Sequence, residues 1–391
     1  MVENTNRPMI RFKGFTDAWG QCEFLCLVNR LSQQSDADNL PKVEFEDIVS
    51  GEGVLNKDVS CKFDNRKGIV FEPGNILFGK LRPYLKNWLF ADFKGVALGD
   101  FWVFEANDVA PLFIYYLIQT EQYQEIANLS TGTKMPRSDW KTVSEHIFSI
   151  PSEILEQATI GKFFRTLENA INLHKRKLEG LKALKKGYLQ QMFPQKGEKV
   201  PRVRFEGFTG EWAEKKLQEV ANYRNGKAHE QNILIEGRYI IINSKFVSTN
   251  GLIQKYSNEQ LEPLYMGEIA FVLSDVPNGR AIARTFLIDE DDKYTLNQRI
   301  AAITPHTNTN AYFLHQLLNR NQYFLKFDDG VGQTNLLRSD VEKFVSVYPK
   351  AEEQTAIGNF FRNLDEYITA QMQKLEQLKK LKAAYLQKMF I

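Results

Sequence analysis

The stretch EQATIGKFFRTLENAINLHKRKLEGLKALKKGYLQQMF, residues 156–193, occurs twice in this chain. The second copy, EQTAIGNFFRNLDEYITAQMQKLEQLKKLKAAYLQKMF at residues 353–390, aligns on the first without gaps, with 21 identities in 38 positions. A shorter match, RFKGFTDAW at 11–19 and RFEGFTGEW at 204–212, opens each half of the chain. Self-similarity at a nearly fixed spacing indicates a tandem duplication, whose unit is about half of the 391 residues.

Both copies carry apolar residues at alternating steps of four and three, which is the pattern of a coiled-coil seam. The seam residues are Ile160, Phe164, Leu167, Ile171, Leu178, Leu181, Ile357, Phe361, Leu364, Ile368, Leu375 and Leu378. A helix of about 40 residues with one apolar stripe must bury that stripe, and the matching stripe of the other copy is the expected partner. We predict an antiparallel coiled coil, although two independent helices, each packed on its own module, stay open.

The segments outside the repeats predict two globular modules that mix short apolar strands with one helix each, around residues 111–129 and 310–327. The expected fold is therefore α/β (α+β), with two tandem domains separated by the coiled coil and related by a pseudo-twofold axis. The expected boundaries are 1–151 for the first module, 152–193 for the first spacer helix, 194–200 for a linker, 201–349 for the second module and 350–391 for the second spacer helix. The linker stretch PQKGEKVP contains two prolines and one glycine.

The segment GNILFGKLRP, residues 74–83, nearly matches a phosphate-binding P-loop. The motif requires Ser or Thr after the lysine as a Mg²⁺ ligand, and this chain has Leu81 there. Ile76, Leu77 and Phe78 stand where a backbone anion cradle should be, so the segment is typical of a buried strand. We therefore reject a nucleotide-binding function for this segment.

Composition excludes several other classes of protein. The three cysteines form no C-x-x-C pair and the five histidines are scattered, so neither a disulfide framework nor a metal site is expected. No apolar run reaches the ~18 residues of a membrane span, and the first residues lack the features of a signal peptide. A cytoplasmic protein is expected.

Charge is distributed unevenly along the chain. Residues 152–199 carry 10 Lys and Arg against 5 Asp and Glu, whereas residues 1–151 carry 16 against 20 and residues 200–349 carry 17 against 18. Within the modules, cations without acids gather in two segments, residues 73–91 and 276–288. Arg and Asn suit base edges and Lys suits phosphates, so these segments are candidates for contact with nucleic acid, although ordinary solvated surface charge would look similar.

This combination of features resembles the DNA specificity (S) subunits of type I restriction-modification systems. The residues that carry the resemblance are the paired segments EQATIGKFFRTLENAI and EQTAIGNFFRNLDEYI, the helix endings YLQQMFPQ and YLQKMF, the module openings RFKGFTDAW and RFEGFTGEW, and GNILFGKLRPYLKN at 74–87. GDFWVF at 99–104, NGKAHE at 225–230 and YTLNQRI at 294–300 also fit. The resemblance spans nearly the whole chain.

The resemblance implies that each module is a target recognition domain for one half of a bipartite DNA sequence, and that the helices set the spacing and dock methyltransferase subunits. The implied partners are double-stranded DNA, two modification (methyltransferase) subunits and two restriction (ATP-dependent translocase and endonuclease) subunits, without a membrane. S-adenosylmethionine, ATP and Mg²⁺ would belong to those partners, and this chain would be non-catalytic with no cofactor of its own. A cytoplasmic coiled-coil adaptor that binds only proteins, and a chain that is itself an enzyme, stay open as alternatives.

The candidate DNA-binding residues lie in the two cationic segments, in the polar loops STGTKMPRSD at 130–139 and DGVGQTNLLRSD at 329–340, and in the Asn-containing segments of the second module. They are Lys80, Arg82, Tyr84, Lys86, Asn87, Thr133, Lys134, Arg137, Asn225, Lys227, Asn243, Lys245, Asn278, Arg280, Arg284, Gln333, Thr334 and Arg338. We expect no catalytic or metal-binding residue, and the acidic run DEDD at 289–292 is expected to be a surface turn.

Overall fold

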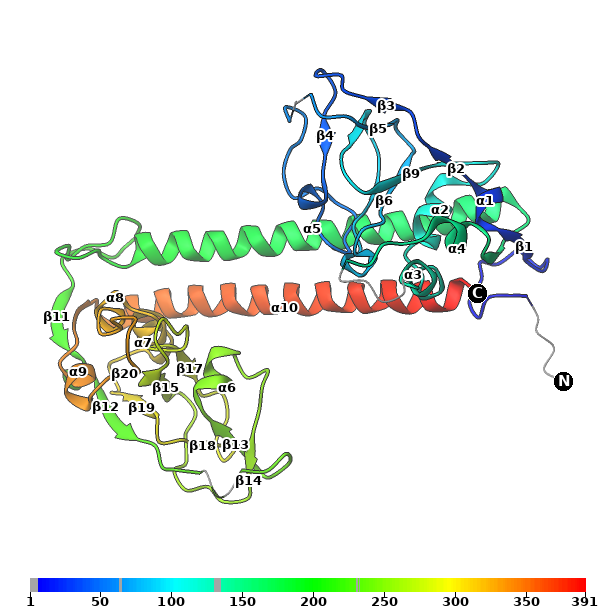
Figure 1. Cartoon of the computed structure of the whole chain (residues 1–391). Coiled ribbons are helices and arrows are strands. Elements are labelled where there is room, and N and C mark those ends of the chain that lie inside the picture. The colour runs from blue at the N-terminus through cyan, green and yellow to red at the C-terminus, as the bar shows by residue number, and fades with distance from the viewer. Residues whose placement is uncertain (1–5, 63–64, 130–134, 230, 232) are drawn as a thin grey trace. The chain divides into compact units, whose positions relative to one another are not determined.

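A computed structural model of the chain describes residues 6–62, 65–129, 135–229, 231 and 233–391. The chain forms two compact units, Met1–Arg176 with Gln373–Ile391, and Lys177–Met372. Two long helices, α5 (Ile154–Met192) and α10 (Ala351–Met389), each contribute one part to the first unit and one part to the second (Figure 1). A unit therefore consists of one module, the beginning of one long helix and the end of the other.

The module of the first unit contains two four-stranded sheets with the strand orders β2-β9-β6-β7 and β3-β5-β8-β4, and a two-stranded sheet of β1 and β10. Its strands are β1 (Gly20–Glu23), β2 (Val28–Leu31), β3 (Gln34–Ser35), β4 (Lys42–Val43), β5 (Gly68–Phe71), β6 (Ile76–Gly79), β7 (Trp88–Phe90), β8 (Gly95–Ala97), β9 (Phe101–Ala106) and β10 (Ile147–Ile150). Side chains alternate along β9: Trp102 and Phe104 enter one apolar core, whereas Phe101 and Val103 enter another.

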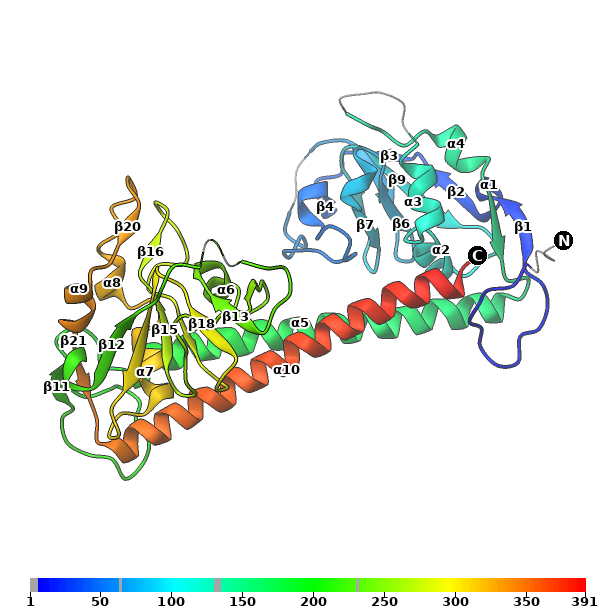
Figure 2. The same cartoon turned by 90° about the horizontal axis from the view of Figure 1, so that it is seen from below.

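Helices cover the Trp102 side of the first sheet. They are α1 (Phe24–Leu27), α2 (Pro111–Leu117), α3 (Glu121–Ala127) and α4 (Trp140–Ser144), with 3-10 turns η1 (Phe45–Asp47) and η2 (Pro83–Leu85) in the loops. The single helix expected over 111–129 is wrong, because α2 ends at Leu117 and Thr120 caps α3 by accepting a hydrogen bond from the backbone N–H of Tyr123. Figure 2 shows α2 close to α5, and a Cβ on Gly161 of α5 would stand 2.7 Å from Cβ of Leu112.

The module of the second unit repeats this plan. Its sheets have the orders β12-β19-β15-β17, β14-β13-β18, β16-β20 and β11-β21. The strands are β11 (Ala213–Lys216), β12 (Ala221–Asn225), β13 (Tyr239–Ile242), β14 (Tyr256–Ser257), β15 (Ile269–Val272), β16 (Ser274–Asp275), β17 (Thr285–Leu287), β18 (Tyr294–Leu296), β19 (Ile300–Pro305), β20 (Thr334–Asn335) and β21 (Val345–Tyr348). The helices are η3 (Leu217–Glu219), α6 (Ser244–Ser248), α7 (Ala311–Leu318), α8 (Gln322–Leu325) and α9 (Arg338–Glu342). Here too, two helices replace the one expected over 310–327.

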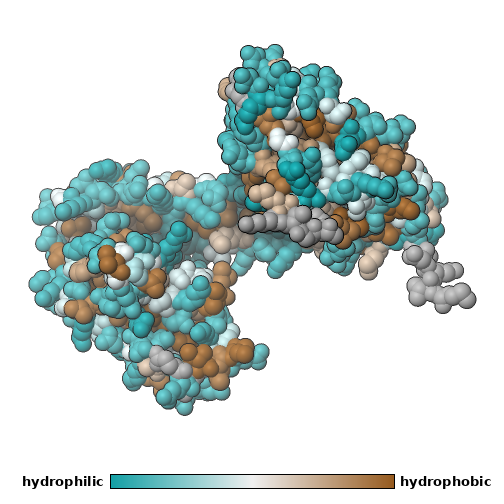
Figure 3. All heavy atoms as spheres, in the orientation of Figure 1, coloured by the Kyte–Doolittle hydropathy of each residue, from teal (hydrophilic) through white to brown (hydrophobic). Residues whose placement is uncertain are grey.

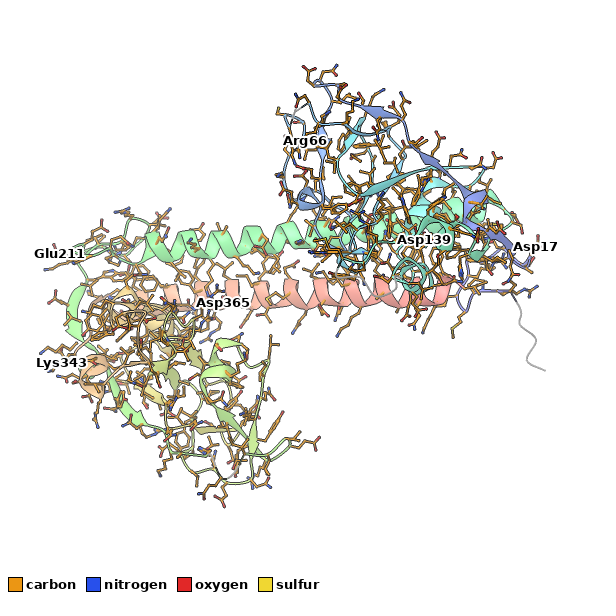
Figure 4. All side chains as sticks on the ribbon, in the orientation of Figure 1. Asp17, Arg66, Asp139, Glu211, Lys343 and Asp365 are labelled. Atoms are coloured by element: carbon orange, nitrogen blue, oxygen red, sulfur yellow. The ribbon has the colours of Figure 1, made fainter. Side chains whose placement is uncertain are left out.

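Inside each unit the two long helices run antiparallel. In the first unit Phe163 packs on Tyr385, with ring centroids 5.1 Å apart, and Glu168 pairs with Lys382 at 2.7 Å, so the residue numbers rise on α5 as they fall on α10. In the second unit the matching contacts are Tyr188 with Phe360 at 5.0 Å and Lys185 with Asp365 at 2.6 Å. Figure 4 labels Asp365 on α10. The predicted mixed fold with two tandem modules is confirmed, and the antiparallel direction holds within each unit.

Most of the predicted seam residues are buried, and part of the seam packs on the modules. Ile160 and Phe164 belong to the core of the first module, and Ile357 and Phe361 belong to the core of the second. Leu167, Ile171, Leu178, Leu364 and Ile368 are also buried, whereas Leu181, Leu375 and Leu378 are half-buried. The first turns of each long helix therefore pack on a module.

The last aromatic residue of each repeat enters the module of the other half. Phe390, at the end of α10, stacks on Phe113 of the first module with centroids 5.2 Å apart. Phe193, just after α5, stacks on Phe313 of the second module at 5.3 Å. Each module core is thus completed by the helix that begins in the other half of the sequence.

A bidentate ion pair fixes the opening segment of each module to the start of its long helix. The Arg11 guanidinium donates to both carboxylate oxygens of Glu156 at 2.6 and 2.7 Å, and Arg204 donates to both oxygens of Glu353 at 2.7 Å. The two glutamate side chains are only 1% and 2% exposed. Because such a carboxylate would be costly to leave unpaired, the module openings RFKGFTDAW and RFEGFTGEW are structural elements.

The contribution of Phe390 can be tested by truncation. Phe390→Ala should lower the free energy of unfolding by about 3–5 kcal/mol, because it leaves a cavity against Phe113 and Phe164. Ile391→Ala is the control, since Ile391 is 38% exposed. Chemical denaturation should show the loss in the free energy of unfolding. Hydrogen exchange of the native protein should show that Phe390→Ala, and not Ile391→Ala, reduces protection in the first module. Equal protection in both variants contradicts the assignment.

A histidine whose Nδ1 is buried should give the second unit a pH dependence. Burial and the charge of Lys185 lower the pKa of His315 to about 4, although Asp365 opposes the shift. The unfolded state therefore binds more protons than the folded state between about pH 4 and pH 6.5, and the free energy of unfolding should fall as the pH decreases through that range. His315→Gln should reduce this dependence in urea unfolding at about pH 7 and about pH 5. An unchanged difference between the two pH values would show that His315 does not cause it.

Candidate nucleic-acid interface

The cationic segment of the first module lies at the end of β6, where the neighbouring strand β9 begins. Leu81 forms a bridge with Arg137, the Arg82 backbone N–H donates to the carbonyl of Pro136 at 2.8 Å, and the Ser138 N–H donates to the carbonyl of Lys80 at 2.8 Å. The loop after β6 and the end of the polar loop 130–139 are therefore held side by side. The structure brings Lys80, Arg82 and Arg137 together, as the candidate site requires.

Asp100 organises the cations of this surface. Its carboxylate accepts a hydrogen bond from Nη2 of Arg137 at 2.9 Å and lies 3.7 Å from Nζ of Lys80. Asp100 precedes β9 directly, so the antiparallel pairing of β9 with β6 places it beside the end of β6. Nothing in the local sequence identified Asp100 as a partner, because the contact depends on the register of that pairing.

A tight turn presents the rest of the first segment. Arg82 and Lys86 flank η2 and have left-handed backbone conformations, with φ 50° and φ 54°, which residues other than glycine rarely adopt. Tyr84 is 54% exposed and Lys86 is exposed, whereas Asn87 is only 7% exposed and its carbonyl accepts the Gly79 N–H. Tyr84 and Lys86 therefore belong to the surface, and the Asn87 side chain does not. The predicted residues Thr133 and Lys134 lie outside the described residues.

The second module has a corresponding surface at the end of β15. Here β16 pairs with β20, Gln333 donates to the Ser274 hydroxyl at 2.7 Å, and the Asn278 amide donates to the carbonyl of Gly330 at 3.3 Å. The segment 273–284 and the polar loop 329–340 are thereby joined, as their counterparts are in the first module. Thr334 lies within this junction and is 5% exposed.

Asp275 shapes the loop that carries the two arginines of this surface. Its carboxylate accepts backbone N–H groups from Val276 at 2.9 Å, Ala281 at 2.5 Å and Ile282 at 3.1 Å. A Cβ at Gly279 would stand 2.1 Å from this carboxylate, so only glycine fits there. The loop presents Arg280 as an exposed side chain and bends back so that Nε of Arg284 donates to the carbonyl of Arg280 at 2.6 Å.

The other candidates of the second module lie on different elements. Asn225 accepts a hydrogen bond from the Tyr223 hydroxyl at 2.6 Å, and Arg338 lies over the ring of that same tyrosine. Lys227 pairs with Glu262 at 3.3 Å. Asn243 caps α6 by accepting the Phe246 N–H, and Lys245 is exposed on that helix. Asn225 and Arg338 thus form one group, whereas Asn243 has a structural role in capping.

The tripeptide RSD occurs at 137–139 and at 338–340, but the two copies do not occupy equivalent positions. In the structure the bridge Leu81–Arg137 corresponds to the pair Ser274–Asn335, and α4 and α9 begin at Trp140 and Arg338. Arg137 therefore matches Asn335, and Trp140 matches Arg338.

Neither a metal-holding cluster nor a membrane-spanning helix occurs among the described residues. They contain no group of three or more His, Cys, Asp or Glu side chains that could hold a metal ion. Over the same ranges, no helix combines the length and the apolar character needed to cross a membrane. Hydrophilic residues cover most of the face visible in Figure 3.

Comparisons with known proteins agree with this geometry. The family described as type I restriction modification DNA specificity domain matches twice, at residues 49–183 and 209–380. The chain is 23% identical over 288 residues to the specificity subunit of the type I restriction enzyme MjaVIII of Methanocaldococcus jannaschii, which covers 69% of this chain and 67% of that protein.

Two solved structures share the fold. The S subunit of a type I restriction-modification system from M. genitalium has a TM-score of 0.69 at 15% identity and covers 98% of this chain and 99% of its own. A chain from a structure that describes complex assembly and conformational transition of the type I R-M system has a TM-score of 0.53 at 18% identity and covers 95% of this chain and 97% of its own.

The duplicated α+β fold, together with the double match to a DNA specificity domain, defines a DNA-recognition subunit. The family matches cover more than half of the chain, so this protein belongs to the family of type I restriction-modification DNA specificity subunits. The resemblance seen in the repeats is confirmed, and nothing in the comparisons supports an adaptor that binds only proteins.

The role of Asp275 can be tested directly. Asp275→Ala leaves the N–H groups of Ala281 and Ile282 unpaired, and these residues are 8% and 1% exposed, so the loop should lose about 2–3 kcal/mol of local stability. Hydrogen exchange at the two amides should accelerate by about 30-fold or more. Asp329→Ala is the control, because its N–H partners Val331 and Gly332 are exposed. Unchanged exchange in Asp275→Ala would refute the role.

Proposed function

We propose that each module of this protein binds one half of a bipartite double-stranded DNA target. The observation that carries the proposal is that both modules build a surface from the same two loops. One loop follows β6 in the first module and β15 in the second, and the other loop precedes α4 in the first module and α9 in the second. The side chains on these surfaces differ: Lys80, Arg82 and Arg137 in the first module, and Asn278, Arg280 and Gln333 in the second. A common frame with different side chains suits the recognition of two different half-sites.

We further propose that the long helices set the distance between the half-sites and dock two modification (methyltransferase) subunits. An open groove of about 1010 Å³ in the first unit and one of about 930 Å³ in the second are lined in part by matching positions of the two repeats. These positions are Ala383, Leu386 and Gln387 on α10, and Lys186, Leu189 and Gln190 on α5. Grooves that share these helix positions support two copies of one partner.

In this proposal the chain is a non-catalytic subunit that acts in the cytoplasm. Adenine methylation, with S-adenosylmethionine, would be the activity of the modification subunits. DNA cleavage, with ATP and Mg²⁺, would be the activity of two restriction subunits that join the complex. The chain itself would contribute the choice of DNA sequence.

Exchange of one module tests the proposal. The first module enters and leaves through β1 and β10, where Gly20 pairs with Ile150, so residues 20–150 can be replaced at two adjacent joints. Replacement by the corresponding module of another family member should change one half of the methylated motif in genome-wide methylation mapping and leave the other half unchanged. The reciprocal replacement of residues 213–348, which Ala213 and Tyr348 delimit, is the control. A change in both halves after one replacement would contradict the proposal.

A further inference from the structure

An arginine that the candidate site did not include stacks on a tryptophan in the first module. Cζ of Arg30, on β2, lies 4.6 Å from the ring centroid of Trp140, the first residue of α4. Arg30 is exposed, and the described residues give it no ion pair. Its position is nevertheless defined, because β2 pairs with β9 and Trp140 packs on Trp102 and Phe104 of that strand.

The second module contains the same kind of pair on the matching elements. Cζ of Arg338, the first residue of α9, lies 5.4 Å from the ring centroid of Tyr223 on β12. Arg338 is 62% exposed in its side chain, and its Nε donates to Glu342 at 2.8 Å. The Tyr223 hydroxyl donates in turn to Asn225, which is itself a candidate contact.

The elements correspond although the residue types are exchanged. Strands β2 and β12 are edge strands of the sheets β2-β9-β6-β7 and β12-β19-β15-β17, and α4 and α9 are the short helices that precede the last strand of each module. The first module has the cation on the strand and the ring on the helix; the second has the ring on the strand and the cation on the helix. Figure 1 labels these four elements, β2, α4, β12 and α9. Both arrangements put an exposed guanidinium between the edge strand and the short helix, β2 and α4 in the first module and β12 and α9 in the second.

Two observations connect this place with the candidate surfaces. In the first module, Trp140 follows Arg137 by three residues, and Asp139, labelled in Figure 4, caps α4 between them. In the second module, Tyr223 joins Arg338 to Asn225. Each stacked arginine therefore lies beside residues that we have assigned to the DNA-facing side.

We propose that Arg30 and Arg338 are matching contacts to the phosphate backbone of the two half-sites; this rests on the proposed function. Stacking holds a planar guanidinium in place, so less side-chain entropy is lost when it binds an oxyanion, and its N–H groups fit a phosphate. The phosphate backbone is the part of DNA that is the same in both half-sites. A feature that keeps its chemistry and its place in both modules, while the neighbouring loops differ, suits that common part.

The test uses the complex of the full chain with its modification subunits. In Arg30→Ala and in Arg338→Ala, binding to target DNA and to unrelated duplex DNA should weaken by a similar factor of about 5–20 at ~0.1 M salt. The slope of log K against log salt should become shallower by about 1. Arg30→Lys keeps the charge and loses the planar stack, so it should recover part of the affinity. Arg7→Ala and Arg202→Ala, at exposed residues that precede the module openings, are matched controls.

The outcomes separate this proposal from the proposed function. If the wild-type complex binds its target and the alanine variants have the same affinity and salt slope, the proposal of phosphate contacts is overturned and the proposed function stays intact. A methylation profile in which Arg30→Ala relaxes one base of the motif would also overturn them, because Arg30 would then read a base. If the wild-type complex does not bind DNA, the proposed function itself is overturned. Thermal unfolding of each variant checks that the affinity loss does not come from misfolding.

Discussion

Each module of this protein depends on the end of a helix that begins in the other half of the chain. Phe390 completes the core around Phe113, and Phe193 completes the core around Phe313, so neither module has its full core within one continuous half. The ion pairs Glu168–Lys382 and Asp365–Lys185 then fix the antiparallel register beside these cores. The Glu168 carboxylate is only 4% exposed, so a slipped register that separates it from Lys382 is disfavoured. Each half of the chain therefore supplies a part of the core that the other half needs.

The sequence revealed the parts of the structure that are determined locally or by repetition. The long helices, the tandem modules and the buried strand of GNILFGKLRP follow from spacing and apolar pattern, and the gap-free repeat exposed the duplication. The break between α2 and α3 was missed because the apolar pattern continues through Ile118, while the decisive event is the capping hydrogen bond of Thr120. A heptad pattern does not tell whether a residue such as Phe164 faces the other helix or a module core.

The candidate surfaces were found only in part, for a similar reason. Lys80 and Arg82 stood out because they are close in sequence and have no acid beside them. Asp100 and Asp275, which organise the two surfaces, carry no such signal; one contact requires the register of β6 with β9, and the other requires the fold of a loop around Gly279. Arg30 and Trp140 are far apart in sequence, and the copies of RSD pointed to a false equivalence. Equivalent places in the two modules are defined by strand pairing and not by similar letters.

The exchange of cation and ring between β2–α4 and β12–α9 indicates how such modules can diverge. Strand pairs β1–β10 and β11–β21 bring the two ends of each module together, Gly20 beside Ile150 and Ala213 beside Tyr348. The frame outside these joints consists of the arginine–glutamate pairs and the helix contacts, which are the same in both units. Inside the joints, a sequence is compatible with the frame when it restores the sheet order and the packing of Phe113 or Phe313 on the long helices. Selection can then act on the loops for new half-sites, because the helix packing does not depend on them.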